Sequence, residues 1–507
     1  MQIMQKMDVS SSHHVVLFPY MSKGHTIPLL QFARLLLRHR RVLPGEDDGK
    51  QPTISVTVFT TPKNQPFVSN FLSEDVASSS SVRVISLPFP ENIVGIPPGI
   101  ESTDKLPSMS LYVPFTRATK SLQPLFEAAL KNLPKVSFMV TDGFLWWTSE
   151  SAARFDIPRL AFYGMNSYAS AIVSSVWVHE LFTKPESVIS DTEPVTVPDF
   201  PWISVKKCHF DPVLTNSDQS GPDFELLMDH IISTKKSRGV IVNSFYELES
   251  TFVDYRSRDD HEPKPWCVGP SCLVNPHKPE SDKPDWIDWL DRKREEGRPV
   301  LYVAFGTQAE ISNQQLNEIA LGLENSKVNF LWVTRKDLDD EVTGSGLGLE
   351  KRVKENGLIV REWVNQWEIL SHESVKGFLS HCGWNSVQES ICAGIPLLAW
   401  PMMAEQPLNA KLVVEELKIG VGIEAEDGSV KGLVRKEELS RKIKELMEGE
   451  MGKTAKNNVM EYAEMAKKAL VPETGSSWKN LNSLLEELCK SREPDGVCEL
   501  SSDEQRD

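Results

Sequence analysis

Short apolar runs alternate with longer amphipathic segments along the first half of the chain. The apolar runs, each expected to form a buried strand, are Val15–Pro19, Ile54–Phe59, Val82–Leu87, Val136–Val140, Leu160–Phe162 and Val240–Val242. Apolar residues recur with helical periodicity over residues 29–37, and residues 148–155 form a second helical segment. Short buried strands that alternate with helices are typical of a doubly wound parallel sheet.

The same alternation restarts in the second half of the chain. Val300–Phe305 is a near-continuous apolar run, and Ser312 is the expected N-cap of the helix that follows it. Further strands are expected at 330–333, 358–360, 377–379 and 396–399, and helices at 436–448 and 477–490. The two halves are separated by a proline-rich stretch without periodicity, which is typical of a linker.

These patterns predict two α/β domains of the Rossmann-like, doubly wound type that face each other across a cleft. The N-terminal domain is expected to span residues 1–262, the linker 263–284 and the C-terminal domain 285–490. Residues 491–507 are polar and are expected to be disordered. Because open α/β sheets bind ligands at the carboxyl ends of their strands, the functional site is expected in the cleft.

Charge and cysteine content narrow the class of protein. The formal net charge of −16 argues against a nucleic-acid partner, which requires a basic surface. Seven cysteines at irregular spacing, with no C-x-x-C, are typical of reduced thiols in a cytosolic protein, and the N-terminus lacks the apolar core of a signal peptide. The uncharged stretch Leu160–His179 contains Asn166 and is interpreted as a strand and a buried helix. We therefore expect a cytoplasmic monomer without membrane insertion.

The segment Trp363–Gln406 carries the most informative pattern of polar residues. His381 is expected at the carboxyl end of a strand, and Gly383, Asn385 and Ser386 at the N-terminus of the next helix. Free backbone N–H groups, the helix dipole, a hydroxyl and an amide together favour an anion such as a diphosphate.

Other residues of this segment point to the rest of a nucleotide sugar. Glu389 lies one helical turn beyond Asn385 and could accept hydrogen bonds from a ribose diol, while Trp363 offers a flat face to a nucleobase. Glu405 and Gln406 follow the next strand and could bind sugar hydroxyls. Spacing alone also allows a packed βαβ unit in which the tryptophans belong to the core.

These 44 residues, with their W, Q, HCGWNS, E and EQ positions, resemble the signature segment of the plant UDP-dependent glycosyltransferases, the family 1 enzymes of GT-B fold. The resemblance extends to about residue 488, and VAFGTQAEIS is similar to subgroup 90. It implies that Trp363 stacks on uracil, that the Val364 backbone pairs with the uracil edge, and that Gln366 and Glu389 hold the ribose. We also expect the last helix to pack back on the N-terminal domain.

The resemblance implies further roles around the diphosphate and the sugar. The residues implied to hold the diphosphate are Thr307, His381, Asn385 and Ser386. Those implied to contact the transferred sugar are Trp384, Glu405 and Gln406. The chain departs from the family pattern at Glu405, usually Asp, at Thr307, often Ser, and at Gly164, where many relatives carry Thr. The Gln at position 406 is similar to enzymes that use glucose.

The N-terminal half contains a candidate general base. His25 follows the first strand and Asp142 ends the strand VSFMVTD, so neighbouring parallel strands would bring both to the cleft. A lone loop histidine is more often a surface or capping residue, but the family has a catalytic His–Asp dyad at these two positions. The resemblance therefore implies an inverting transfer of glucose from UDP-glucose to a hydroxyl, with His25 as base and no metal or other cofactor.

The sequence is compatible with several classes of acceptor and with a second function. The implied acceptors are flavonoids, other phenolics, terpenoids and hormones, and aromatic side chains near the cleft are candidates for binding them: Phe89, Phe144, Trp146, Trp147, Phe200 and Trp202. The alternative is a nucleotide-sugar-binding protein without activity. A nicotinamide oxidoreductase is disfavoured, because neither strand 15–19 nor strand 300–305 is followed by G-x-G-x-x-G.

Overall fold

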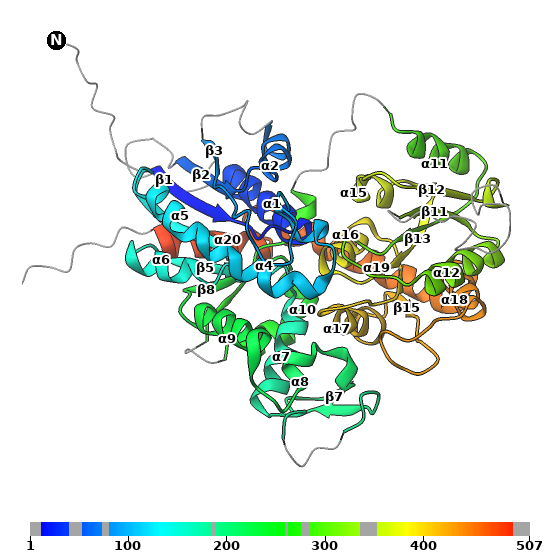
Figure 1. Ribbon diagram of the computed structural model, residues 1–507. Helices are drawn as coiled ribbons and strands as arrows, with labels where there is room; N and C mark the ends of the chain where they lie inside the picture. The colour runs from blue at the N-terminus through cyan, green and yellow to red at the C-terminus, as the bar shows by residue number, and fades with distance from the viewer. Residues whose placement is uncertain are drawn as a thin grey trace, which may run out of the picture.

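The computed structural model describes residues 12–39, 53–73, 81–184, 189–258, 262–274, 283–334 and 352–489. The chain forms two α/β lobes (Figure 1): the blue to mid-green part and the red C-terminal helix form one, and the remaining green to orange part forms the other. The predicted fold class is therefore confirmed. The predicted disordered tail, 491–507, lies outside the described residues.

Parallel strands form the sheet of the first lobe, in the order β3-β2-β1-β4-β5-β8-β9 over the described part of the chain. Their bounds are β1 Ser12–Phe18, β2 Thr53–Thr60, β3 Val82–Ser86, β4 Val136–Asp142, β5 Arg159–Phe162, β8 Gly239–Val242 and β9 Pro265–Cys267. Most of these strands are apolar because helices cover both faces of the sheet. A short antiparallel hairpin, β6 Val195–Val197 and β7 Phe200–Val205, lies outside the sheet.

Helices on both faces of this sheet complete the first lobe. They are α1 Lys23–His39, α2 Gln65–Phe71, α4 Tyr112–Ala118, α5 Gln123–Leu130, α6 Thr148–Arg154, α7 Ser167–Val178, α8 Pro212–Thr215, α9 Gly221–Lys235 and α10 Tyr246–Arg256. The uncharged stretch interpreted as a strand and a buried helix forms β5 and α7, and the Asn166 side chain caps α7 by accepting a hydrogen bond from the Ala169 backbone N–H. No helix within the described residues is long and apolar enough to cross a membrane.

The second lobe repeats the same winding with a sheet in the order β12-β11-β10-β13-β14-β15. The strands are β10 Val300–Ala304, β11 Asn329–Val333, β12 Gly357–Val360, β13 Val375–Ser380, β14 Leu397–Ala399 and β15 Gly420–Gly422. The helices are α11 Asp285–Glu295, α12 Asn313–Ser326, α15 Gln366–Leu370, α16 Trp384–Ala393, α17 Gln406–Lys411, α18 Lys436–Glu448, α19 Glu450–Ala469 and α20 Ser476–Cys489. Ser312 caps α12 as predicted, since its hydroxyl accepts a hydrogen bond from the Gln315 backbone N–H.

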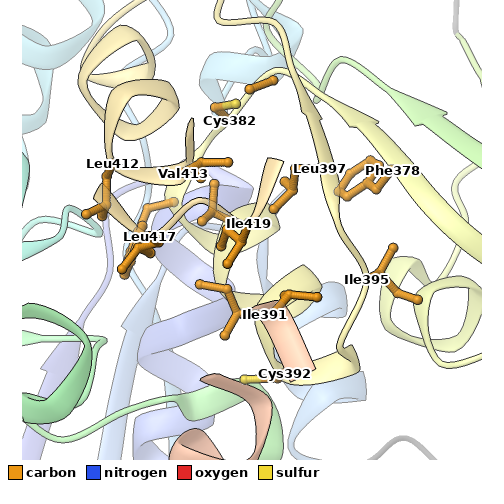
Figure 2. Packing of buried hydrophobic residues seen from close by; sticks show 14 of the residues in the cluster. Phe378, Cys382, Ile391, Cys392, Ile395, Leu397, Leu412, Val413, Leu417 and Ile419 are labelled. Atoms are coloured by element: carbon orange, nitrogen blue, oxygen red, sulfur yellow. The ribbon is translucent and has the colours of Figure 1, made fainter. Parts of the chain in front are cut away.

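The core of the second lobe holds the strands and α16 in place. Side chains from β13, α16 and β14 and from the π-helical turn after α17 point toward one another (Figure 2). The labelled residues are Phe378, Cys382, Ile391, Cys392, Ile395, Leu397, Leu412, Val413, Leu417 and Ile419. This packing fixes the start of α16 relative to the end of β13, which matters for the site described below.

The boundary between the lobes differs from the prediction. The expected linker, 263–284, contains β9, which pairs with β8 and so extends the first sheet. Proline is tolerated there because β9 is an edge strand and needs partners on one side only. At the other end of the chain α20 returns to the first lobe, where Leu481, Leu484 and Leu485 pack in the same cluster as α1 and β1. Its label lies over the first lobe in Figure 1.

Candidate active site

The carboxyl ends of four strands meet between the lobes. In each sheet the winding reverses between two neighbouring strands, β1 and β4 in the first and β10 and β13 in the second. His25 follows β1, Asp142 ends β4, Thr307 follows β10 and His381 follows β13. Such reversal points leave a crevice at the carboxyl edge of a parallel sheet, so both lobes present their candidate residues to the same space.

A cavity of about 1530 Å³ occupies this space and is lined by both lobes. It brings together His25 and every residue predicted to contact the UDP-sugar: Thr307, Trp363, Val364, Gln366, His381, Trp384, Asn385, Ser386, Glu389, Glu405 and Gln406. Residues far apart in sequence therefore form one site large enough for a nucleotide sugar and a second small molecule.

His25 and Asp142 form a hydrogen-bonded pair at the first lobe's edge of the cavity. His25 Nδ1 lies 2.7 Å from Asp142 Oδ2, and the carboxylate is fully buried behind the imidazole. The Phe144 backbone N–H donates to the other carboxylate oxygen over 3.0 Å, which fixes its orientation. With Nδ1 engaged, the Nε2 of His25 is the nitrogen available to a substrate.

The surroundings of His25 make its imidazole more basic. Burial alone would lower its pKa, but the charge of Asp142, the hydrogen bond to it and the charge of Glu405 outweigh that effect and raise the pKa above the ordinary value of 6.5. A raised pKa suits a group that must take up a proton during a reaction.

The second lobe offers a cradle for an anion at the N-terminus of α16. The first turn of this helix lines the cavity, and Gly383 precedes it without a side-chain cap. The His381 ring lies between Gly306 and Gly383, where an added Cβ would come within 2.7 and 2.6 Å of its Nε2. Burial lowers the pKa of His381 to about 4, so the imidazole is neutral at pH 7, and its Nδ1 has no hydrogen-bond partner among the described residues.

Polar side chains beside α16 form a small network suited to a diol. Gln366 Nε2 donates to Ser386 Oγ over 2.9 Å and to Glu389 Oε2 over 2.6 Å. Burial raises the pKa of Glu389 to about 7, with the Gln366 hydrogen bond opposing the shift. Trp363 stands at the cavity edge with 57% of its surface exposed, so its ring face is open to a flat ligand.

The two residues after β14 are held by further hydrogen bonds. Gln406 Oε1 accepts from the backbone N–H groups of Met402 and Met403, both over 3.0 Å. Burial raises the pKa of Glu405, and the positive charge on His25 opposes that shift, which shows that the two groups share one electrostatic environment. Glu405, from the second lobe, therefore lies close enough to His25 for their charges to interact across the cavity.

Two of the residues predicted to bind the UDP-sugar make hydrogen bonds across the cleft instead. Asn385 Nδ2 donates to the Gly24 carbonyl over 2.7 Å, next to His25. Trp384 is 2% exposed, and its Nε1 donates to the Asn243 carbonyl over 2.7 Å. The Trp384 indole thus joins the lobes, and only its cavity edge could contact a sugar.

The predicted acceptor residues are mostly in the core. Phe144 lines the cavity as expected. Phe89 packs on Phe115, Trp146 beneath the Arg117 guanidinium, and Phe200 against Phe252; all three are nearly buried and none lines the cavity. The expectation that these three bind an acceptor is therefore corrected, because aromatic residues near strand ends also fill the layers between sheet and helices. Trp147 and Trp202 are likewise outside the cavity lining.

Other cavity residues were not predicted from the sequence. Tyr20, Tyr112, Tyr163 and His230 surround Phe144, with ring centroids at 5.3, 5.9, 5.7 and 5.0 Å. They come from loops and helices far apart in the chain, so only the fold brings them together. One hint was the short spacing between Tyr20 and His25.

Comparison with known proteins places these features in context. Residues 275–490 match the family described as UDP-glucoronosyl and UDP-glucosyl transferase. The chain is 70% identical over 494 residues to UDP-glycosyltransferase 90A1 of Arabidopsis thaliana, covering 97% of this chain and 100% of that protein. It also resembles two solved structures. One is Glycyrrhiza uralensis UGT73P12 with glycyrrhetinic acid 3-O-monoglucuronide (TM-score 0.81, 32% identity, 94% and 96% coverage). The other is Phytolacca americana UGT2 with UDP-2fluoro-glucose and pterostilbene, with a TM-score of 0.75 and 28% identity; the match covers 94% of this chain and 100% of that one.

Proposed function

This chain belongs to the plant family 1 UDP-glycosyltransferases, subgroup 90, and from that premise we propose that it moves glucose from UDP-glucose to a hydroxyl of a small lipophilic acceptor with inversion at C1. The acceptor is a flavonoid, another phenolic, a terpenoid or a hormone, and the product is a β-glucoside. The observation that supports this most strongly is the His25–Asp142 pair at 2.7 Å, facing the N-terminus of α16 in the same cavity.

In the proposed reaction the acceptor hydroxyl bonds to His25 Nε2. The hydroxyl oxygen attacks C1 of glucose as His25 takes its proton, and Asp142 stabilises the imidazolium that forms. The bond between C1 and the diphosphate oxygen breaks on the opposite face, and UDP leaves with the electron pair. The α-linked donor therefore gives a β-glucoside through an oxocarbenium-like transition state.

The C-terminal lobe stabilises the leaving group in this proposal. The backbone N–H groups at the start of α16, the neutral His381 imidazole, Ser386 and Thr307 bind the diphosphate, so the reaction requires no metal ion or other cofactor. Asn385 must release the Gly24 carbonyl to join them. Uracil stacks on Trp363 and pairs with the Val364 backbone, and the ribose replaces internal contacts of Gln366 and Glu389.

Glucose is proposed as the transferred sugar because of the two residues that follow β14, Glu405 and Gln406. Because Gln406 uses its carbonyl oxygen internally, its NH2 group is left to contact sugar hydroxyls. Glu405 accepts further hydrogen bonds from the sugar, while Gly164, whose added Cβ would lie 3.9 Å from the His25 ring, contributes no side chain to sugar binding. We propose that the enzyme acts as a cytoplasmic monomer; its six described cysteines are free thiols.

The experiment is UDP release from UDP-glucose, with and without a mixed panel of flavonoids, simple phenols and terpene alcohols, for wild type and His25→Ala. We expect acceptor-dependent release that falls by roughly 10²–10⁴-fold in the variant on an alcohol acceptor. The rise in Tm caused by UDP-glucose should be unchanged in the variant, because the donor site is intact.

Two outcomes would contradict the proposal in different ways. A donor-dependent rise in Tm without release for any acceptor would favour the non-catalytic binding protein. Full activity of His25→Ala on an alcohol would remove the dyad from the mechanism.

A further inference from the structure

Phe144 packs beside two imidazoles on the wall of the cavity. Its ring centroid is 5.0 Å from that of His25 and 5.0 Å from that of His230, which belongs to α9. The two imidazoles are therefore separated by at most twice this distance. A flat molecule lying against Phe144 could reach both of them.

His230 is a buried polar group without a partner. It is 7% exposed, it lines the cavity, and its Nε2 has no hydrogen-bond partner anywhere in the described ranges. Burial, reinforced by the charges of Arg117 and Arg159, lowers its pKa to about 3, so the ring is neutral at physiological pH. Burying such a group is unfavourable unless something bonds to it. Because the residue lines the cavity, a turn of its side chain would bring this buried nitrogen to a ligand there.

The neighbouring polar groups on this wall are already engaged. Tyr163 Oη bonds to Thr234 Oγ1 at 2.5 Å, and Tyr20 Oη to Thr116 Oγ1 at 2.6 Å. Their rings therefore serve as apolar surface around Phe144, while the His230 imidazole keeps hydrogen-bonding capacity for a ligand.

We propose that His230 is a second polar anchor for the acceptor and binds an oxygen at the end opposite to the hydroxyl held by His25. The inference rests on the proposed function and names its substrate class: planar aromatic acceptors with two separated oxygens. A terpene alcohol or a phenol with a single oxygen leaves His230 unpaired and is a poorer substrate, because sites built to bond an oxygen discriminate against analogues that lack it.

The chemistry of the distal oxygen follows from the state of His230. A neutral imidazole has one N–H and one lone pair, so a hydroxyl satisfies either tautomer, whereas a carbonyl satisfies only the N–H. A carboxylate gains no counter-charge from the neutral ring. The two cations whose charges reach His230 are already engaged, Arg117 by Asp229 and Arg159 by hydrogen bonds to the Thr141 and Ser237 hydroxyls. The distal group is therefore an uncharged oxygen, with hydroxyl favoured.

The test compares 4,4′-dihydroxybiphenyl with 4-phenylphenol, which have the same ring system and differ in the distal oxygen. Both kcat/KM with UDP-glucose and Kd in the presence of UDP are measured by turnover and calorimetry. For wild type we expect the diol to be better by about tenfold in both, after the factor of two for its equivalent hydroxyls. In His230→Phe, which keeps the ring and adds no polar group, the preference disappears, and His230→Gln restores part of it.

His179→Phe is the matched control, since His179 lies at the end of α7 and does not line the cavity. The control should keep the tenfold preference. Equal use of the two acceptors by wild type, failure to bind either one, or a preference that survives in His230→Phe overturns the inference. If both acceptors are turned over equally well, only the role of His230 as an anchor is overturned. If the diol binds more tightly but neither acceptor is turned over, the anchor is supported and the proposed transfer is overturned.

Discussion

At the scale of single residues, the chemistry depends on one buried carboxylate and the imidazole in front of it. Sequence could suggest His25 and Asp142 because each stands at the carboxyl end of an apolar run, where parallel sheets present side chains to a ligand. It could not give their 2.7 Å separation, which requires β1 and β4 to be neighbours. The residues that line the acceptor side of the cavity were harder to predict. Phe144 and Phe89 look alike in sequence, and only the packing shows that Phe144 lines the cavity and Phe89 belongs to the core.

The raised pKa of His25 leads to a prediction about pH. The base must be neutral to accept a proton, so kcat/KM falls as pH drops through its pKa, and the midpoint should lie above 6.5. Asp142→Asn removes the larger of the two charges that raise the pKa of His25, so that burial, which lowers it, is opposed mainly by Glu405. The midpoint should therefore move to lower pH while the plateau rate falls, because the imidazolium loses its stabilising partner.

A kcat/KM profile with an alcohol acceptor, measured across this pH range for both proteins, checks this. A phenol is unsuitable because its own ionisation overlaps the range. An unchanged midpoint in Asp142→Asn would mean that a group other than His25 controls the acid limb.

At the scale of elements, strands that are continuous apolar runs were predictable, including β14 with only three residues. β9 and β15 are equally short, but their Pro-Trp-Cys and Gly-Val-Gly sequences cannot be told from loops by pattern. Helix α19 was missed for another reason: its buried face consists of small residues such as Gly452, Ala455 and Ala463 rather than of large apolar ones. At Gly452 an added Cβ would lie 1.9 Å from the Leu446 carbonyl oxygen, so close helix packing favours small residues there.

The two turns that hold His381 give a prediction at the same scale. Gly306→Ala and Gly383→Ala both place a Cβ within 3 Å of His381 Nε2, so the ring must shift and UDP binding should weaken by roughly tenfold or more in each. Only Gly306 has a positive φ, +73°, so Gly306→Ala should also lower the free energy of unfolding by about 1–2 kcal/mol more than Gly383→Ala does.

Gly297→Ala is the control, because Gly297 has a φ of +66° and nothing within 4 Å of an added Cβ. It should lose stability through backbone strain and bind UDP normally. The measurements are Kd for UDP by calorimetry and urea unfolding. Normal UDP binding by both turn variants would remove His381 from the diphosphate site.

At the scale of the whole molecule, the two lobes are joined across the cleft by buried hydrogen bonds that no sequence pattern predicted. Asn166 Nδ2, at the start of α7, donates to Asn409 Oδ1 over 2.8 Å. Asn409 Nδ2 in turn donates to the Cys382 carbonyl over 2.9 Å, next to His381. This chain of amides links the lobe that holds the base to the turn that holds the diphosphate. Linker length and composition could not reveal it, because it depends on how two separately folded sheets are oriented.

This link predicts coupling between Asn166 and Asn409. Asn409→Ala leaves two buried polar groups unpaired and should lower the free energy of unfolding by about 1–3 kcal/mol. Asn166→Ser keeps a cap for α7 but removes the donor across the cleft. In a double-mutant cycle, Asn166→Ser should lower the free energy of unfolding by about 1 kcal/mol less in the Asn409→Ala background than in wild type, because the bond between the two residues is already lost there.

The same cycle applied to kcat/KM should show coupling, because Asn409 orients the turn beside His381. Asn458→Ala is the control: its Nδ2 donates to the Lys418 carbonyl over 2.9 Å within the second lobe, and neither residue lines the cavity. It should change activity little. Strict additivity of Asn166→Ser and Asn409→Ala in both stability and kcat/KM would mean that the lobes are positioned by other contacts, with Trp384 and the Asn243 carbonyl as the next pair to test.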